Sequence, residues 1–157
     1  FMLIEKDKRG IELQLLYSDE NFSVPANVYI IGMMNTADRS LAMLDYALRR
    51  RFSFFTMKPG FNTPGFQAYQ DSLGSDAFNK LIACVKQLNS KIAEDISLGE
   101  GFCIGHSYFC GLAPETANTQ TLSSIVEYEL IPLLKEYWFD EPEKIIDWSD
   151  RLRSTVK

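Results

Sequence analysis

The residues best suited to chemistry lie between positions 27 and 55, where an apolar, largely β-branched run is followed by a polar turn. Asn35 and Asp38 belong to that turn, and α/β proteins bind ligands at such strand ends. An Asn side chain there can hold a water molecule against a phosphate. The alternative is a simple turn in which Asp38 or Ser40 caps a helix that begins near Leu41. The residues alone leave both interpretations open.

Three consecutive arginines, Arg49, Arg50 and Arg51, end the helical pattern that follows the turn. A guanidinium does not deprotonate in proteins, and it can bind a carboxylate or phosphate through two parallel hydrogen bonds. An arginine that reaches a neighbouring subunit can stabilise a phosphoryl group during transfer. The alternative is a solvated helix end that complements the helix dipole, with one ion pair to Asp38 or Asp45.

His106 is the only histidine of the chain, and it lies between Gly105 and Ser107. This arrangement is compatible with a helix start whose backbone amides face an anion. A lone histidine among apolar and aromatic neighbours is more often a packed, hydrogen-bonded core residue. Both a ligand contact and a structural role therefore remain open for His106.

Several chemistries are disfavoured by what the sequence lacks. It contains no G-x-x-x-x-G-K-[ST] phosphate loop and no apolar strand ending in paired acidic residues able to hold magnesium. Cys84, Cys103 and Cys110 form no CxxC pair, so we expect neither a metal site nor a disulfide framework. A reducing cytoplasm is the simplest setting. The chain by itself is not expected to hydrolyse a nucleotide.

The composition is that of a globular protein, with 46% hydrophobic and 24% charged residues in 157 positions. A net charge of −5 argues against a general nucleic-acid-binding face, although a local basic patch around residues 49–51 is still allowed. No apolar run approaches the roughly 20 residues of a membrane helix, so no membrane contact is expected. The chain begins at Phe1 without a methionine, which suggests a piece of a longer protein.

The first 58 residues have the pattern of a partial α/β unit. Residues 11–17 and 22–24 are predicted to form a β-hairpin around a polar turn. Continuous apolar runs at 28–34 and 52–57 predict buried strands, and the spacing of leucines in 39–51 predicts a helix between them.

A Pro/Gly-rich stretch from Lys58 to Gly65 is predicted to be a hinge and a domain boundary. Residues 59–157 then follow helical periodicity, and Pro132 predicts a kink because it removes a backbone hydrogen bond. The apolar residues that define two of these helices are Phe78, Leu81, Ile82, Val85, Leu88 and Ile92 in the first, and Leu122, Ile125, Val126, Leu130, Leu133, Leu134 and Tyr137 in the second.

Four blocks that occur in order carry a family resemblance: LIEKDKRG, NVYIIGMMNTADRSLAMLDYALRRRFSFF, GFCIGHSYFCGL and IVEYELIPLLKEYWFD. They closely resemble the C-terminal part of the McrB-like AAA+ GTPases of methylation-dependent restriction systems. The resemblance runs from about Met2 to Asp147. It implies an α/β fold class in which residues 1–58 are the C-terminal portion of an AAA+ αβα core, an incomplete P-loop NTPase fold, and residues 59–157 are an all-helical lid.

The resemblance also implies roles for single residues. Asn35 falls where the family has its sensor-1 polar residue, close to the γ-phosphate and the attacking water. Arg50 and Arg51 match the arginine-finger region, which reaches into the nucleotide site of the adjoining subunit. Asp38 and His106 are implied to contact the nucleotide, and no residue is expected to bind the metal.

One position departs from the family pattern. Related sequences can carry a basic residue shortly before the Ile-Gly-His-Ser block, whereas this chain has Cys103. This departure puts a charged contact from the lid to phosphate in question and leaves a structural role open for His106.

The implied function is a hexameric NTPase motor that hydrolyses GTP, or ATP, with Mg²⁺ and powers DNA cleavage by a McrC-like endonuclease subunit. The phosphate loop, the metal-binding strand and any DNA-reading domain would then precede Phe1. An alternative function, from a different class, is a non-catalytic domain that docks a partner protein through its helical bundle and acidic surface.

Overall fold

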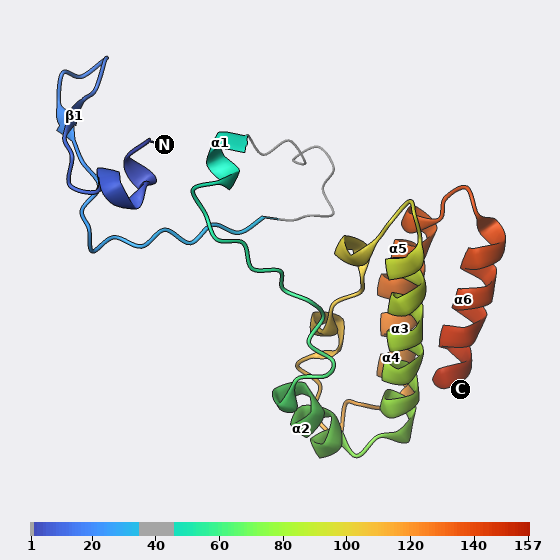
Figure 1. The fold of residues 1–157 in the computed structure, drawn as a ribbon. Coiled ribbons are helices and arrows are strands. Elements are labelled where there is room, and N and C mark those ends of the chain that lie inside the picture. The colour runs from blue at the N-terminus through green and yellow to red at the C-terminus, as the bar shows by residue number, and fades with distance from the viewer. Residues whose placement is uncertain (1, 35–45) are drawn as a thin grey trace. The chain divides into compact units, whose positions relative to one another are not determined.

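The computed structural model describes residues 2–34 and 46–157. These residues belong to two compact units, Phe1–Thr56 and Met57–Lys157, which are described separately below (Figure 1). The division falls immediately before the Pro/Gly-rich stretch that begins at Lys58.

The described residues of the first unit, 2–34 and 46–56, contain little regular structure. Their elements are the 3-10 helices η1 (Met2–Ile4) and η2 (Lys6–Lys8), the strands β1 (Leu13–Gln14) and β2 (Asn21–Phe22), and the helix α1 (Tyr46–Arg49). The strands pair antiparallel, with Leu13 opposite Phe22. The predicted hairpin is therefore confirmed, in shorter form. Of the helix predicted at 39–51, residues 39–45 lie outside the described residues.

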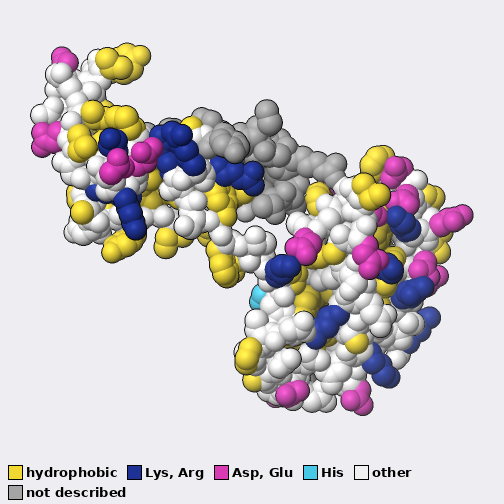
Figure 2. All heavy atoms as spheres, viewed as in Figure 1, with side chains coloured by type: hydrophobic (Ala, Val, Ile, Leu, Met, Phe, Trp, Pro, Cys, Tyr) yellow, Lys and Arg dark blue, Asp and Glu magenta, His cyan; other side chains and the backbone are white. Residues whose placement is uncertain are grey.

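The prediction of buried strands at 28–34 and 52–57 is wrong for this structure. Neither segment belongs to a sheet, and the side chains of both are largely open to solvent. Ile31 is 91% exposed and Phe55 is 89% exposed. A central strand needs hydrogen-bonded neighbours on both sides, and the single sheet among the described residues contains only β1 and β2. Figure 2 shows the resulting apolar side chains, in yellow, on the surface of the first unit.

The second unit is helical, as the sequence predicts. Its α-helices are α2 (Pro64–Leu73), α3 (Asp76–Glu94), α4 (Thr119–Ile125), α5 (Ile131–Tyr137) and α6 (Pro142–Thr155). Helix α3 packs against α4 and α6, and α5 also packs against α6 (Figure 1). The 3-10 helices η4 (Glu100–Phe102) and η5 (His106–Phe109) lie in the connection between α3 and α4.

Helix α3 is the centre of this core. Ser75 caps its N-terminus, where the Ser75 hydroxyl accepts a hydrogen bond from the Phe78 amide at 3.3 Å. The predicted apolar stripe from Phe78 to Ile92 is confirmed, since each of its six side chains is at most 1% exposed. Burial of such side chains contributes roughly 1.5–3 kcal/mol each to folding.

At Pro132, where the sequence predicts a kink, the structure has a local change of helix type. A π-helix, η6 (Val126–Leu130), separates α4 from α5 just before this proline. In a regular helix the proline ring would clash with the carbonyl of Tyr128, four residues earlier, and the proline has no amide to donate. The wider π-turn is a common way to accommodate such a disruption.

The irregular connection between α3 and α4 is held by single side chains. The Asn89 amide nitrogen donates to the Ile104 carbonyl at 2.9 Å, and its oxygen accepts from the Ile104 amide at 2.7 Å. The Tyr69 hydroxyl donates to the Phe109 carbonyl at 3.0 Å and accepts from the Leu112 amide at 2.9 Å. These contacts provide hydrogen-bond partners for backbone groups that have none within a helix or strand.

Asp95 connects the ends of α3, α5 and α6. One of its oxygens accepts hydrogen bonds from Trp138 Nε1 at 2.9 Å and Lys144 Nζ at 3.0 Å, and the other accepts from the amide and the hydroxyl of Ser97 at 2.8 and 2.6 Å. The Ser97 hydroxyl, followed by the Trp138 indole, holds the pKa of this carboxyl well below its usual range.

Replacement of Asn89 with Ala should destabilise the chain by about 2–3 kcal/mol, because it leaves both backbone groups of the buried Ile104 without partners. Urea unfolding monitored by circular dichroism measures this loss. The matched control is Gln87→Ala on the exposed face of the same helix, which should change stability by less than about 0.5 kcal/mol. Equal effects of the two substitutions would contradict the assigned role of Asn89.

Replacement of Asp95 with Ala should destabilise the chain most above about pH 5, where the carboxylate is ionised in both folded and unfolded states. Because the folded state holds the Asp95 pKa below its unfolded value, this stabilisation is lost as the pH falls from about 4 toward the folded pKa. The stability difference between wild type and Asp95→Ala should therefore narrow between pH 6 and pH 3 in urea titrations. Asp147→Ala, at a side chain that is 54% exposed, is the control, and a pH-independent difference for Asp95→Ala would refute this prediction.

Candidate functional site

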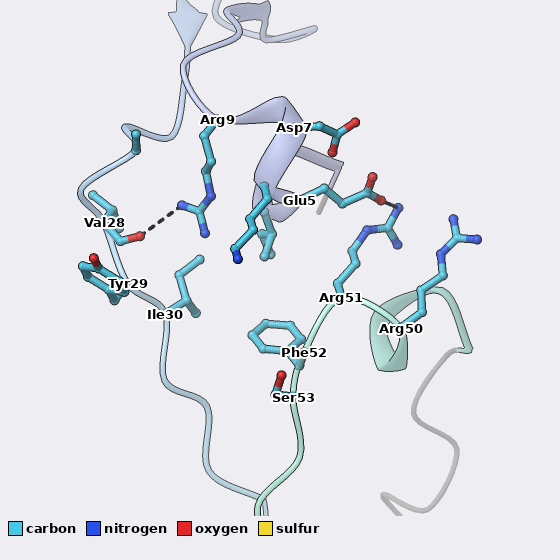
Figure 3. A pocket seen from close by; sticks show the side chains of 13 residues that line it. Glu5, Asp7, Arg9, Val28, Tyr29, Ile30, Arg50, Arg51, Phe52 and Ser53 are labelled. Carbon is cyan, nitrogen blue, oxygen red and sulfur yellow. Dashed lines mark hydrogen bonds and ion pairs between the residues drawn. The ribbon is translucent and has the colours of Figure 1, made fainter.

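The arginine cluster lies beside a hollow of about 950 Å³ in the first unit (Figure 3). Three segments surround this hollow: the η1–η2 region, the extended residues 26–30, and the chain that follows α1. The residues that line it are Ile4, Glu5, Lys6, Asp7, Arg9, Ala26, Val28, Tyr29, Ile30, Arg50, Arg51, Phe52 and Ser53.

Arg51 is fixed by contacts within the unit. Its Nη2 lies 2.6 Å from Glu5 Oε1, and its Nη1 donates to the Ala47 carbonyl at 2.5 Å. The side chain is only 12% exposed, and its Nε is buried without a hydrogen-bond partner among the described residues. The alternative that the sequence leaves open is a solvated helix end with an ion pair to Asp38 or Asp45, both of which lie outside the described residues. The carboxylate that the structure pairs with Arg51 is that of Glu5.

Arg50 is in a different situation from Arg51. It is exposed, and within the described part of the chain it makes no ion pair or side-chain hydrogen bond. Figure 3 shows Arg50 beside Arg51, without an interaction to any of the other lining residues drawn. Arg49 is also exposed, with its guanidinium carbon 5.7 Å from the centre of the Phe54 ring. The three adjacent arginines therefore differ in what they contact: within the described residues Arg51 has a carboxylate partner, Arg49 lies over an aromatic ring, and Arg50 has neither.

The charges around the hollow favour an anion. Lys6 and Arg9 add positive charge to that of Arg50, and Arg9 donates one hydrogen bond to the Val28 carbonyl at 3.2 Å. Glu5 is neutralised by Arg51. Asp7 also lines the hollow, and its exposed carboxylate lies 3.4 Å from Lys8 Nζ. What these lining residues offer a ligand is therefore an excess of positive charge, contributed by Lys6, Arg9 and Arg50.

His106 belongs to the second unit and begins the 3-10 helix η5. Its Nδ1 accepts a hydrogen bond from the Gly60 amide at 2.9 Å, and its ring packs edge to face on Phe66 with ring centres 5.8 Å apart. These contacts correspond to the packed, hydrogen-bonded interpretation of His106. A four-residue 3-10 helix does not provide the helix start that an anion site would require.

The other predicted nucleotide-contacting residues, Asn35 and Asp38, lie outside the described residues. Cys103 is half-buried, its Sγ lies 3.5 Å from the Asn89 carbonyl oxygen, and burial raises the pKa of its thiol. In the described part of the chain, no group of three or more His, Cys, Asp or Glu side chains could hold a metal ion. None of the described helices is long and apolar enough to cross a membrane.

Sequence reasoning missed two residues that organise these regions. Glu5 stands in a charged run that looks like an ordinary helix end, and nothing local links it to Arg51, 46 positions away. The structural role of Asn89, by contrast, can be inferred from its position in the sequence. It falls on the buried stripe of α3, four residues after Val85, and a polar residue at such a position must have hydrogen-bond partners.

Comparison with known proteins agrees with this architecture. Residues 80–146 match the sequence family described as the alpha-helical lid domain of McrB. The matched range begins inside α3 and ends inside α6, so it covers most of the helical core of the second unit.

Two characterised relatives are restriction proteins. The EcoKMcrB subunit of the type IV methyl-directed restriction enzyme from Escherichia coli K12 is 50% identical over 96% of this chain. The component YdiS of the type II restriction enzyme BsuMI from Bacillus subtilis 168 is 32% identical over 54% of the chain. The chain spans 35% and 26% of the lengths of these relatives. The chain is therefore McrB-like, and its residues 80–146 are an McrB α-helical lid domain.

Proposed function

We propose that this chain is the C-terminal part of the AAA+ module of an McrB-like GTPase that acts in DNA restriction. In this proposal, the full-length protein assembles into a hexameric ring, hydrolyses GTP and powers DNA cleavage by a McrC-like endonuclease subunit. The observation that carries the proposal is the 50% identity to the E. coli McrB subunit over 96% of the chain.

The extent of this identity supports more than a shared helical lid. A match confined to residues 80–146 would support only that lid. The wider match covers 96% of the chain, so it spans the polar turn with Asn35 and the arginines of residues 49–51. These are the residues of this chain whose chemistry suits phosphate, and their presence within the matched region favours a nucleotide-dependent function.

The geometry of the arginine cluster suggests different roles for Arg50 and Arg51. Arg50, which is exposed and has no ion-pair partner among the described residues, is the better candidate for the finger that reaches a neighbouring subunit's γ-phosphate. Arg51 is held by Glu5 and by the Ala47 carbonyl, and would fix the end of α1 so that Arg50 projects from it. Asn35 would orient the attacking water in the same subunit.

The residues of this chain would form only part of the proposed nucleotide site. An exposed guanidinium suits the terminal phosphate of a neighbour, while the sequence has no phosphate loop to hold the subunit's own GTP and Mg²⁺. Bound Mg²⁺ would neutralise charge that develops on the transferring phosphoryl group. The residues of this chain would add positive charge, through Arg50, and water positioning, through Asn35.

Replacement of Arg50 with Ala in the full-length protein should slow GTP turnover by a factor on the order of 10³ or more, because the charge that stabilises the transition state is lost. GTP binding should change by less than about threefold, since the finger serves the adjoining site. Steady-state phosphate release and equilibrium binding of a fluorescent GTP analogue measure the two effects.

Arg51→Ala should slow turnover and also lower the thermal stability, because it leaves Glu5 without its ion-pair partner. Arg49→Ala is the matched control in the same exposed cluster, and its turnover should remain close to that of the wild type. Unchanged turnover in both Arg50→Ala and Arg51→Ala would refute the proposed finger.

The 157-residue chain alone should show no GTP hydrolysis with Mg²⁺, because its sequence contains no phosphate loop. A malachite green assay for phosphate, with the full-length protein as the positive control, checks this. If the isolated chain hydrolyses GTP, and its specific activity stays constant on further purification, the residue roles proposed above are wrong.

A further inference from the structure

The Pro/Gly-rich stretch that looks like a hinge in the sequence is attached to the second unit. We propose that His106 docks residues 58–61 onto the connection between α3 and α4, so that they move with the second unit. The flexible joint between the two units then lies before residue 58, at Thr56 and Met57. This inference does not depend on the proposed nucleotide chemistry.

The first support is the contact between His106 and Gly60. The Gly60 amide donates to His106 Nδ1 at 2.9 Å, a pairing of segments 46 positions apart in the sequence. Since Nδ1 is the acceptor, the neutral imidazole carries its proton on Nε2. The ring is also packed edge to face against Phe61 and Phe66, with ring centres 6.2 and 5.8 Å away.

The second support is that position 60 has no room for a side chain. A Cβ atom built on Gly60 would lie 2.9 Å from His106 Cε1, closer than real Cβ atoms approach, and 3.1 Å from Nε2. Any larger residue would therefore displace the imidazole that accepts the Gly60 hydrogen bond. A hinge glycine would instead be selected for conformational freedom, with open space around it.

The third support is the burial of the next residue. Phe61 is only 3% exposed, and its ring lies 5.3 Å from Phe66 and 5.9 Å from Phe109, centre to centre. Just before it, Lys58 pairs with Glu100 at 3.1 Å, but both side chains are about two-thirds exposed, so this ion pair contributes little. The attachment rests mainly on Gly60 and Phe61.

The consequence is a continuous set of contacts inside the second unit. Gly60 is bonded to His106 at the start of η5, and Asn89 of α3 holds Ile104 in the same connection. Residues 58–61 are therefore linked to the central helix of the second unit. Motion between the two units is then confined to Thr56 and Met57, whereas a flexible stretch from 58 to 65 would spread it over eight residues.

Nuclear magnetic resonance of the 157-residue chain tests the contact, because His106 is its only histidine and its ring nitrogens are unambiguous. We expect a ring protonated at Nε2 and a Gly60 amide protected from hydrogen exchange. His106→Leu should accelerate exchange of the Gly60 amide at least tenfold. His106→Asn, whose side-chain oxygen can take the place of Nδ1, should retain most of the protection, and Lys58→Ala should change it less than threefold.

Backbone ¹⁵N relaxation tests the position of the joint. Residues 58–62 should have the same order parameters as α2, while Thr56 and Met57 should be more mobile. Gly60→Ala should raise the mobility of residues 58–62, and it provides a second test if His106→Leu fails to fold. The proposal is overturned if residues 58–62 are as mobile as Thr56 in the wild type, or if the Gly60 amide exchanges equally fast with and without the imidazole.

Discussion

The burial of one face of α3 is the constraint on which the second unit depends. The side chains of Phe78, Val85 and Leu88 are fully buried, and the helices α4 and α6 pack against this helix. Removal of this apolar surface from water is the dominant favourable contribution to folding. Because α3 is long and capped at its N-terminus, it also presents polar groups at fixed positions, and the less regular parts of the unit are attached to these groups.

A few directed hydrogen bonds hold the connection between α3 and α4 in place. Residues 99–112 contain only short 3-10 turns, yet Asn89, Tyr69 and Gly60 each bind them through directed hydrogen bonds. A buried backbone group without a partner costs about 1–3 kcal/mol, so each bond has few alternatives. The order of this segment therefore depends on specific pairings, whereas the order of the helices depends on apolar area.

Among the described residues of the first unit, the aliphatic runs are open to solvent and α1 is tied to the chain start by the ion pair between Glu5 and Arg51. This ion pair makes adjacent arginines chemically unequal, because Arg51 has a carboxylate partner within the described part of the unit and Arg50 has none. An arginine that already has a carboxylate must give it up to bind a phosphate, so the pairing bears directly on which guanidinium can act on a ligand.

The sequence by itself determined the helical class of the second unit, since the 3.6-residue spacing of Phe78 to Ile92 allows only one face to be buried. It also located the hairpin and the arginine cluster, because turn residues and runs of charge are local signals. It did not determine the state of residues 28–34, since an apolar run becomes a strand only where neighbouring strands supply hydrogen bonds. The tertiary structure alone decided the partners of Arg51 and His106, which lie 46 positions away in each case, because a contact between distant residues leaves no trace in local spacing.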